Sequence, residues 1–233
     1  MTLKALIFDV DGTLAETEEA HRAAFNDSFA ASGLDWCWSR EAYRELLKTT
    51  GGKERMRAYQ DGLPAGARRL SDEEIATLHK RKTARYGEIL AAGDLALRPG
   101  VAELIEAARA AGLKLAVATT TNRPNVEALT RCCWGRPADA VFDVIAAGDE
   151  VAEKKPAPDV YLAALDRLGL PAADCIAFED SRNGLISARG AGLAVVMTPS
   201  VYTDHEDHSG AAQILPSLER AHWPAPLAAA LAG

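Results

Sequence analysis

The feature that most constrains the fold is a regular alternation of apolar runs and amphipathic segments between residues 99 and 199. The apolar runs are short and typical of strands, and they lie at 113–119, 141–147, 175–178 and 193–197. Segments with helical spacing of apolar residues separate them. Because strands that alternate with helices pair in parallel and are covered on both faces, the pattern predicts an α/β fold with a parallel sheet.

A further apolar run, residues 3–8, ends in two aspartates, Asp9 and Asp11, followed by Gly12. In a buried parallel strand, both carboxylates would lie at the carboxyl end, where open α/β sheets bind ligands. Alternation in an extended strand would turn both to the same side, and Gly12 would let the chain turn away. Taken alone, the segment also fits an ordinary Asp-Gly turn or the start of a calcium-binding loop.

Residues 15–90 lack a strand pattern and are typical of polar, amphipathic helices. Within them, Ser71 followed by Glu74 has the spacing of a capping box and predicts a helix start. This block interrupts the α/β pattern after its first strand. We therefore expect a Rossmann-like parallel-sheet core, 1–14 and 91–233, with an inserted α-helical cap, 15–90, that acts as a lid.

Polar side chains also follow three later apolar runs of the predicted sheet. They are Thr119, Lys155 shortly before a helix, and the pair Glu179 and Asp180. Alone, these residues also fit a helix cap, a solvated charge and an acidic pair that complements a helix dipole. Because strand ends converge in a doubly wound sheet, we expect them to meet Asp9 in one crevice. An all-oxygen site of this kind favours Mg²⁺.

Composition restricts the class of partner. The chain has 26 Lys and Arg against 33 Asp and Glu, a net charge of −7. This disfavours a general nucleic-acid binder, which needs a basic surface, but allows one basic pocket for a phosphorylated metabolite. We see no apolar run near the ~20 residues of a membrane span and no secretory segment at the start of the sequence. The sequence thus predicts neither a nucleic-acid nor a membrane partner.

The four cysteines show no spacing typical of a metal site. Adjacent Cys132 and Cys133 could hint at redox chemistry, but neighbouring cysteines seldom form an unstrained disulfide. We expect all four to be small buried side chains in a reducing compartment, and hence a cytoplasmic protein.

Four ordered motifs connect these observations to a known family. The chain resembles the haloacid dehalogenase-like phosphohydrolases over essentially its whole length. The matching residues, from the first motif to the fourth, are Asp9 with Asp11, Thr119, Lys155, and Glu179 with Asp180. The resemblance implies a Rossmann-like core with an inserted cap and a covalent aspartyl-phosphate intermediate. Because Asp11 is present, it argues against the dehalogenases, which lack that second aspartate.

The resemblance also implies a role for each motif. Asp9 would be the nucleophile, and Asp11 would protonate the leaving oxygen and later activate water. Thr119 and Lys155 would neutralise the phosphoryl oxygens. The residues expected to hold Mg²⁺ are Asp9, Asp11 through its backbone carbonyl, Glu179 and Asp180.

Two basic clusters in the predicted cap could bind a second phosphate. Lys53 and Arg55 follow a Gly-Gly pair, and residues 80–82 are Lys-Arg-Lys on a predicted helix. Arginine offers a bidentate fork to phosphate, whereas lysine acts as a point charge. A solvated helix face explains residues 80–82 equally well.

The segments 15–21, 50–55 and 142–149 look like those of the CbbY-type sugar phosphatases, which are similar to β-phosphoglucomutase. By that resemblance the substrate is a phosphorylated sugar, xylulose-1,5-bisphosphate, which inhibits Rubisco of the Calvin cycle. The cap residues that would contact the sugar or its distal phosphate are Glu18, His21, Tyr43, Lys53, Arg55 and Lys82. We expect a monomer.

Three alternatives stay open at this point. A β-phosphoglucomutase-like phosphotransferase would use the same four motifs with a sugar hydroxyl as acceptor in place of water. A phosphatase of another small metabolite, such as phosphoglycolate, would differ only in its cap. A non-catalytic module that binds phosphorylated metabolites is disfavoured, since it would not need the pair Asp9 and Asp11.

Overall fold

The computed structural model describes residues 3–93 and 95–231, and the chain divides into two compact units. One unit, Met1–Glu16 with Leu95–Gly233, contains the sheet. The other, Thr17–Asp94, is helical. The functional domain boundaries expected from the sequence, 1–14 with 91–233 and 15–90, stay a prediction.

The sheet unit is built on parallel strands in the order β3-β2-β1-β4-β5-β6. Along the chain the strand order reverses between β1 and β4, and such a switch point is where open α/β sheets form their ligand crevice. The strands of the described chain are β1 Ala5–Phe8, β2 Lys114–Ala118, β3 Val144–Ala146, β4 Cys175–Glu179, β5 Ala194–Met197 and β6 Gln213–Ile214.

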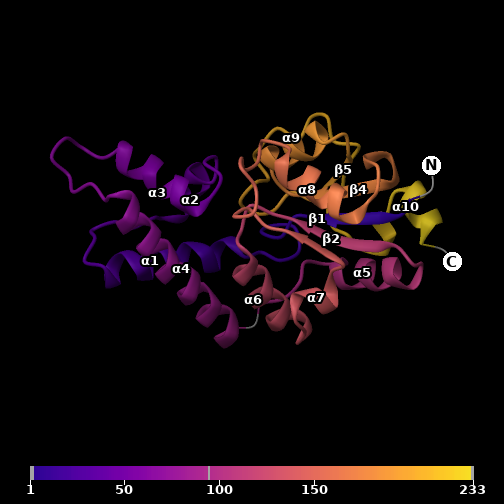
Figure 1. Cartoon of the computed structure of the whole chain (residues 1–233), viewed down its shortest axis with the longest axis horizontal. Helices are drawn as coiled ribbons and strands as arrows, with labels where there is room; N and C mark the ends of the chain where they lie inside the picture. The colour runs from indigo at the N-terminus through magenta and orange to yellow at the C-terminus, as the bar shows by residue number, and fades with distance from the viewer. Residues whose placement is uncertain (1–2, 94, 232–233) are drawn as a thin grey trace. The chain divides into compact units, whose positions relative to one another are not determined.

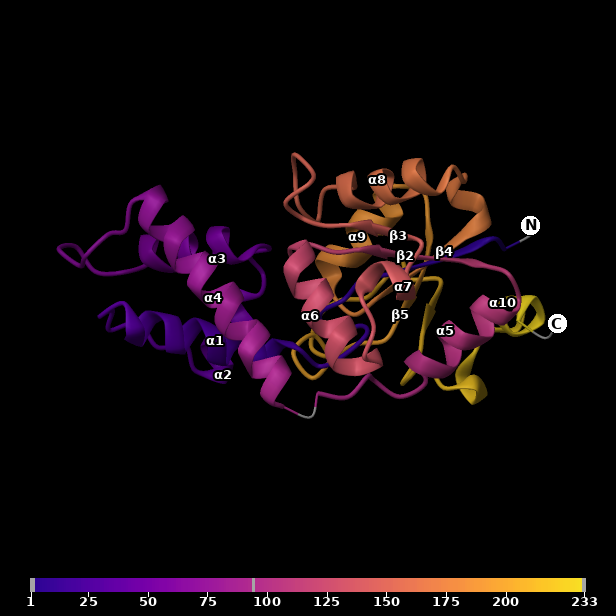
Figure 2. The same cartoon turned by 60° about the horizontal axis from the view of Figure 1, so that its bottom comes forward.

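Helices cover both faces of this sheet, which confirms the predicted α/β class. Figure 1 shows α8 and α9 on one side of the sheet and α5, α6 and α7 on the other, and Figure 2 shows the same separation of α8 from α5. All four residues of β1 are buried, and two of them, Ala5 and Ile7, belong to a buried apolar cluster with Val160 of α8 and Leu185 of α9. The helices of this unit are α5 Val101–Ala110, α6 Arg123–Trp134, α7 Ala138–Val141, α8 Asp159–Leu168, α9 Arg182–Gly190 and α10 Ala225–Ala230, with 3₁₀ turns at Ala172–Asp174 and Arg220–His222.

The prediction of a strand over 141–147 is wrong in its first half. Val141 ends the short helix α7, and the strand is only Val144–Ala146. The α7 start is held by Glu127, whose Oε2 accepts the Ala138 N–H at 2.8 Å. A side chain from the preceding helix thus satisfies one of the N–H groups that the first turn of α7 leaves without a partner in the helix.

The helical unit consists of α1 Glu18–Ala31, α2 Arg40–Leu46, α3 Gly52–Asp61 and α4 Asp72–Ala92. Helices α1 and α4 pack along each other around a core rich in aromatic side chains, where Phe25 and Phe29 both contact Trp38. The predicted capping box is confirmed, because Ser71 Oγ accepts the Glu74 N–H and Glu74 Oε2 accepts the Ser71 N–H.

The expectation of four buried cysteines is wrong. Cys175 is buried, but Cys132 and Cys133 are half-buried and Cys37 is exposed, and all four are free thiols. Among the described residues, no helix is both long and apolar enough to cross a bilayer.

Candidate active site

The register of the central strands brings distant acidic residues side by side. Phe8, the last residue of β1, lies opposite Phe178 of β4, and the Asp9 N–H donates to the Phe178 carbonyl at 3.0 Å. The next residue on β4 is Glu179, so Asp9 and Glu179 lie level at the carboxyl ends of neighbouring strands. On the other side of β1, Thr119 directly follows β2, and its N–H donates to Ala146 at 3.1 Å.

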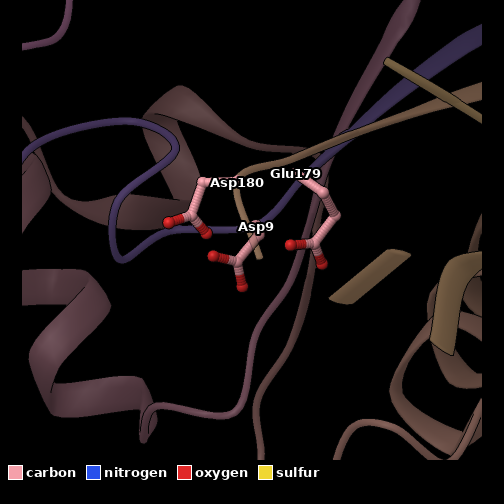
Figure 3. Close-up of side chains that lie close together, drawn as sticks. All are labelled: Asp9, Glu179 and Asp180. Atoms are coloured by element: carbon pink, nitrogen blue, oxygen red, sulfur yellow. The ribbon is translucent and has the colours of Figure 1, made fainter. Parts of the chain in front are cut away.

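Three buried carboxylates form the centre of the site. Oxygen atoms of Asp9, Glu179 and Asp180 all lie within 4.8 Å of one another, and Figure 3 shows these side chains converging from the two strand ends. The Nζ of Lys155 lies 2.6 Å from Asp9 Oδ1 and 2.6 Å from Glu179 Oε1. The structure therefore unites four of the predicted site residues, although Lys155 is 146 positions from Asp9.

Two hydroxyl donors that the sequence analysis missed hold the carboxylates in place. Tyr161 of α8 is fully buried and donates to Glu179 Oε1 at 2.5 Å. Thr203 donates to Asp180 Oδ2 at 2.9 Å. Thr203 follows β5 at the same edge of the sheet, so the criterion that identified Thr119 could have found it. The sequence signal that could have identified Tyr161 is a polar hydroxyl on the apolar face of a predicted helix, because a buried hydroxyl needs a hydrogen-bond partner.

Two glycines allow backbone to approach this cluster closely. A Cβ at Gly12 would lie 2.2 Å from Asp180 Oδ2, and one at Gly184 would lie 1.9 Å from Glu179 Oε2. Gly12 also has a φ of +78°, in the left-handed region that favours glycine. Strand β1 ends at Phe8, so Asp9 and Asp11 both follow the strand and are not alternate residues of it.

Burial dominates the electrostatics of the cluster. It raises the pKa of Asp9 to about 8, even though the nearby Lys155 ammonium works in the opposite direction. Burial, together with the charges of Asp9 and Glu179, raises the pKa of Asp180 well above its usual range. Burial disfavours the charged form of Lys155 as well, but the two carboxylates outweigh it and raise the pKa of this lysine. The cluster thus resists carrying three negative charges.

The donor set fits a divalent cation. If all three carboxylates were ionised beside the one ammonium of Lys155, the cluster would carry a buried charge of −2 (−3 + 1). Glu179 Oε2 is buried and has no hydrogen-bond partner among the residues that the structure describes. An uncompensated buried charge is costly, and carboxylate oxygens are preferred ligands of hard divalent ions. The Asp11 carboxylate lies outside the group of three, although its charge contributes to the raised pKa of Asp9.

Thr119 is placed as a hydroxyl donor. Its side chain is fully buried, and its Oγ1 accepts the Thr121 N–H at 3.2 Å. The bond from Thr121 uses a lone pair of the Thr119 oxygen and not its proton. The O–H of Thr119 can therefore donate to an acceptor such as a phosphoryl oxygen.

Two networks in the helical unit contain the predicted substrate-binding residues. In the first, the Tyr43 hydroxyl donates to Glu18 Oε2 at 2.9 Å and receives a bond from Arg55 Nη1 at 2.9 Å. Arg55 also donates to the Leu46 carbonyl at 3.2 Å and is buried. Lys53, in the first turn of α3, is half-buried. Arg55 therefore stabilises the helical unit through its hydrogen bonds to Tyr43 and Leu46, and its guanidinium also brings a positive charge to this network.

In the second network, Lys82 Nζ lies 2.6 Å from His21 Nδ1. Both side chains are buried, and the ammonium also lies over the rings of Phe25 and Tyr86. The alternative in which residues 80–82 form a solvated basic face is therefore wrong for Lys82. Since Lys82 can only donate, His21 Nδ1 is the acceptor in this contact and Nε2 carries the proton of the neutral imidazole.

Comparisons with known proteins agree with this geometry. The model of the haloacid dehalogenase-like hydrolase family matches residues 3–192. A CbbY protein of Rhodobacter capsulatus is 64% identical over 221 residues, which cover 95% of this chain and 96% of that protein. The crystal structure of CbbY from Rhodobacter sphaeroides in complex with phosphate has a TM-score of 0.92 at 54% identity, covering 97% of this chain and 99% of that one. A mutant of the same protein in complex with xylulose-1,5-bisphosphate has a TM-score of 0.90 at 54% identity, covering 94% and 96%.

Proposed function

Because this chain belongs to the haloacid dehalogenase-like hydrolases and is a phosphatase, we propose that it removes a phosphate from xylulose-1,5-bisphosphate. The observation that carries the choice of substrate is the bisphosphate bound to the CbbY mutant, which is 54% identical to this chain. The proposed role is the removal of this Rubisco inhibitor, in the cytoplasm and as a monomer.

In the proposed reaction, the Asp9 carboxylate forms a bond to phosphorus while the bond from phosphorus to the sugar oxygen breaks. Asp11 gives its proton to that oxygen as it leaves. Water then attacks the phosphorus of the aspartyl phosphate, Asp11 takes a proton from the water, and the bond to Asp9 breaks. Lys155 and the Thr119 hydroxyl offset the charge on the phosphoryl oxygens in both steps.

Mg²⁺ is the proposed cofactor. Asp9, Glu179 and Asp180 would hold it through their carboxylates, and the family resemblance adds the backbone carbonyl of Asp11. When bound, the cation would supply positive charge that keeps these carboxylates ionised and stabilises charge on the phosphoryl group.

The helical unit is proposed to supply substrate specificity. Glu18, Tyr43 and Arg55 form one hydrogen-bonded network, and His21 and Lys82 form another. Lys53 and Arg55 in the first turn of α3 would supply the positive charge that a second phosphate needs. His21 Nε2 and the Glu18 carboxylate are suited to sugar hydroxyls as donor and acceptor.

A release assay over sugar monophosphates, sugar bisphosphates and phosphoglycolate, with and without Mg²⁺, tests the proposal. We expect xylulose-1,5-bisphosphate to give the highest kcat/KM and EDTA to abolish release. Formation of glucose 6-phosphate from β-glucose 1-phosphate without net phosphate release would instead identify a mutase. Preference for phosphoglycolate would overturn the proposed substrate and leave the chemistry intact.

A further inference from the structure

Arg98 makes an unusually complete set of bonds next to the site. Its side chain is only 11% exposed. Its guanidinium donates to three backbone carbonyls, those of Gly12, Thr198 at 2.5 Å and Pro199 at 2.8 Å. Its Nε also lies 3.2 Å from a carboxylate oxygen of Glu16.

The carbonyls bound by Arg98 belong to the two loops that carry the cluster. The Gly12 turn directly follows Asp9 and Asp11 and lies against the Asp180 carboxylate. The other loop follows β5 and leads from Thr198 to Thr203, whose hydroxyl donates to Asp180. Arg98 therefore joins the backbone that presents the first pair of acids to the loop that holds Asp180.

The backbone adds to this connection. The Arg98 N–H donates to the Leu14 carbonyl at 2.8 Å, and Ala15 and Leu97 form an antiparallel bridge. Glu16 and Arg98 thus stand together although the whole helical unit separates them in the sequence. Neither the four motifs nor the mechanism above uses this arginine.

We propose that Arg98 is a positioning residue that sets the spacing between the Asp9–Gly12 loop and Asp180 for phosphoryl transfer. Its effect on catalysis rests on the proposed roles of Asp9 and Asp11. Only a planar guanidinium offers enough donors in fixed directions to reach three carbonyls and a carboxylate at once. A lysine would satisfy fewer of them and would hold the two loops less rigidly.

Arg98→Met and Arg98→Lys test this role, with Arg167→Met as the matched control. Arg167 also donates to a backbone carbonyl, that of Ile145 in the edge strand β3, and to the carboxylate of Glu150, whereas the two loops follow β1 and β5. We expect kcat to fall about tenfold or more in Arg98→Met with KM changed less than about twofold, since the loss is one of transition-state geometry. Arg98→Lys should recover part of kcat, and added guanidinium ion should partly rescue Arg98→Met.

The assay uses both xylulose-1,5-bisphosphate and p-nitrophenyl phosphate, and thermal unfolding is recorded for each variant. If the wild type cleaves only the artificial ester, the proposed substrate fails while the role of Arg98 is still measured. Equal kcat in Arg98→Met and Arg167→Met, or a loss that tracks only the fall in Tm, would overturn the proposal. If Arg98→Met does not fold, a kcat of Arg98→Lys equal to that of the wild type would do the same.

Discussion

At Gly184 the structure leaves no room for a side chain beside the most buried acid of the site. A Cβ there would meet Oε2 and Cδ of Glu179 at 1.9 and 2.0 Å. We expect Gly184→Ala to lower the free energy of unfolding by about 2 kcal/mol, because Glu179 must leave its partners or α9 must shift. Urea unfolding measures this. Gly87→Ala in α4 is the control and should stabilise by about 0.5–1 kcal/mol, since beyond its own helix backbone an added Cβ would meet nothing within 4 Å among the described residues. Equal effects of the two changes would contradict the close packing.

Asp9 is the residue whose loss should separate chemistry from folding. Asp9→Asn keeps the shape of the side chain but removes the proposed nucleophile and one negative charge from the cluster. We expect phosphate release to fall at least about a thousandfold, as for other covalent nucleophiles, while circular dichroism and Tm stay native-like or improve. Substantial activity in this variant would disprove the aspartyl-phosphate route.

At the scale of elements, the connection between β2 and β3 depends on one carboxylate. Burial opposes the ionisation of Asp143, but hydrogen bonds from the Leu115 N–H at 2.9 Å and Lys114 Nζ at 2.7 Å outweigh it and hold its pKa below the usual value. A group whose pKa is lower in the folded state stabilises the fold above its unfolded pKa, and this contribution disappears as the pH falls through the folded pKa.

Asp143→Asn should therefore cost about 1 kcal/mol at pH 7, the scale of one hydrogen bond. The difference from wild type should shrink as the pH falls below about 4. Urea unfolding at several pH values checks this. Asp139→Asn is the control, since Asp139 is exposed and its ion pair with Arg123 lies on the surface. A difference for Asp143 that stays constant down to acid pH would show that the carboxylate charge is not responsible.

At the scale of the whole molecule, cation binding should stabilise the fold. A ligand that binds only the folded chain adds about 2.7 kcal/mol at a hundredfold excess over Kd, or a rise in Tm of about 5–10 °C for a chain of this size. We expect Mg²⁺ to produce such a rise in the wild type and in Asp166→Asn, whose aspartate is exposed on α8. Asp180→Asn should show little or none. The same rise in Asp180→Asn would place the cation elsewhere.

Substrate choice should depend on the helical unit. Lys53→Ala should raise KM for xylulose-1,5-bisphosphate about tenfold, the worth of one charge-assisted hydrogen bond, with little change for a monophosphate. Steady-state kinetics with both substrates measures this. Lys48→Ala is the matched control, since Lys48 is exposed and pairs with Glu45. Arg55→Ala is a poorer probe, because Arg55 also holds Tyr43 and Leu46. Parallel changes for both substrates in Lys53→Ala would remove the distal-phosphate role.

Local pattern was enough to identify β1, β2, β4 and β5 and the polar residues that follow β1, β2 and β4, but it misplaced the start of β3 and did not predict the two-residue strand β6. Apolar runs and breakers depend on near neighbours in the chain, so the sequence alone could place Asp9, Thr119 and Glu179 each at a strand end. Parallel pairing then required those ends to lie along one edge. The prediction of helices within residues 15–90 and of the capping box at Ser71 followed from similar short-range signals.

Tertiary packing decided the rest, because burial and distant contacts are not encoded in any single segment. The predicted strand 141–147 begins only at Val144, because Val141 ends helix α7, whose first residue donates its N–H to Glu127. Lys82 belongs to a basic run, but packing between Phe25 and Tyr86 buries it. Arg98 and Tyr161 look like ordinary surface and core residues until the fold brings carbonyl oxygens and the Glu179 carboxylate to them. A local pattern thus determined which side chains reach the edge of the sheet, and only the assembled fold determined which groups surround them and at what distance.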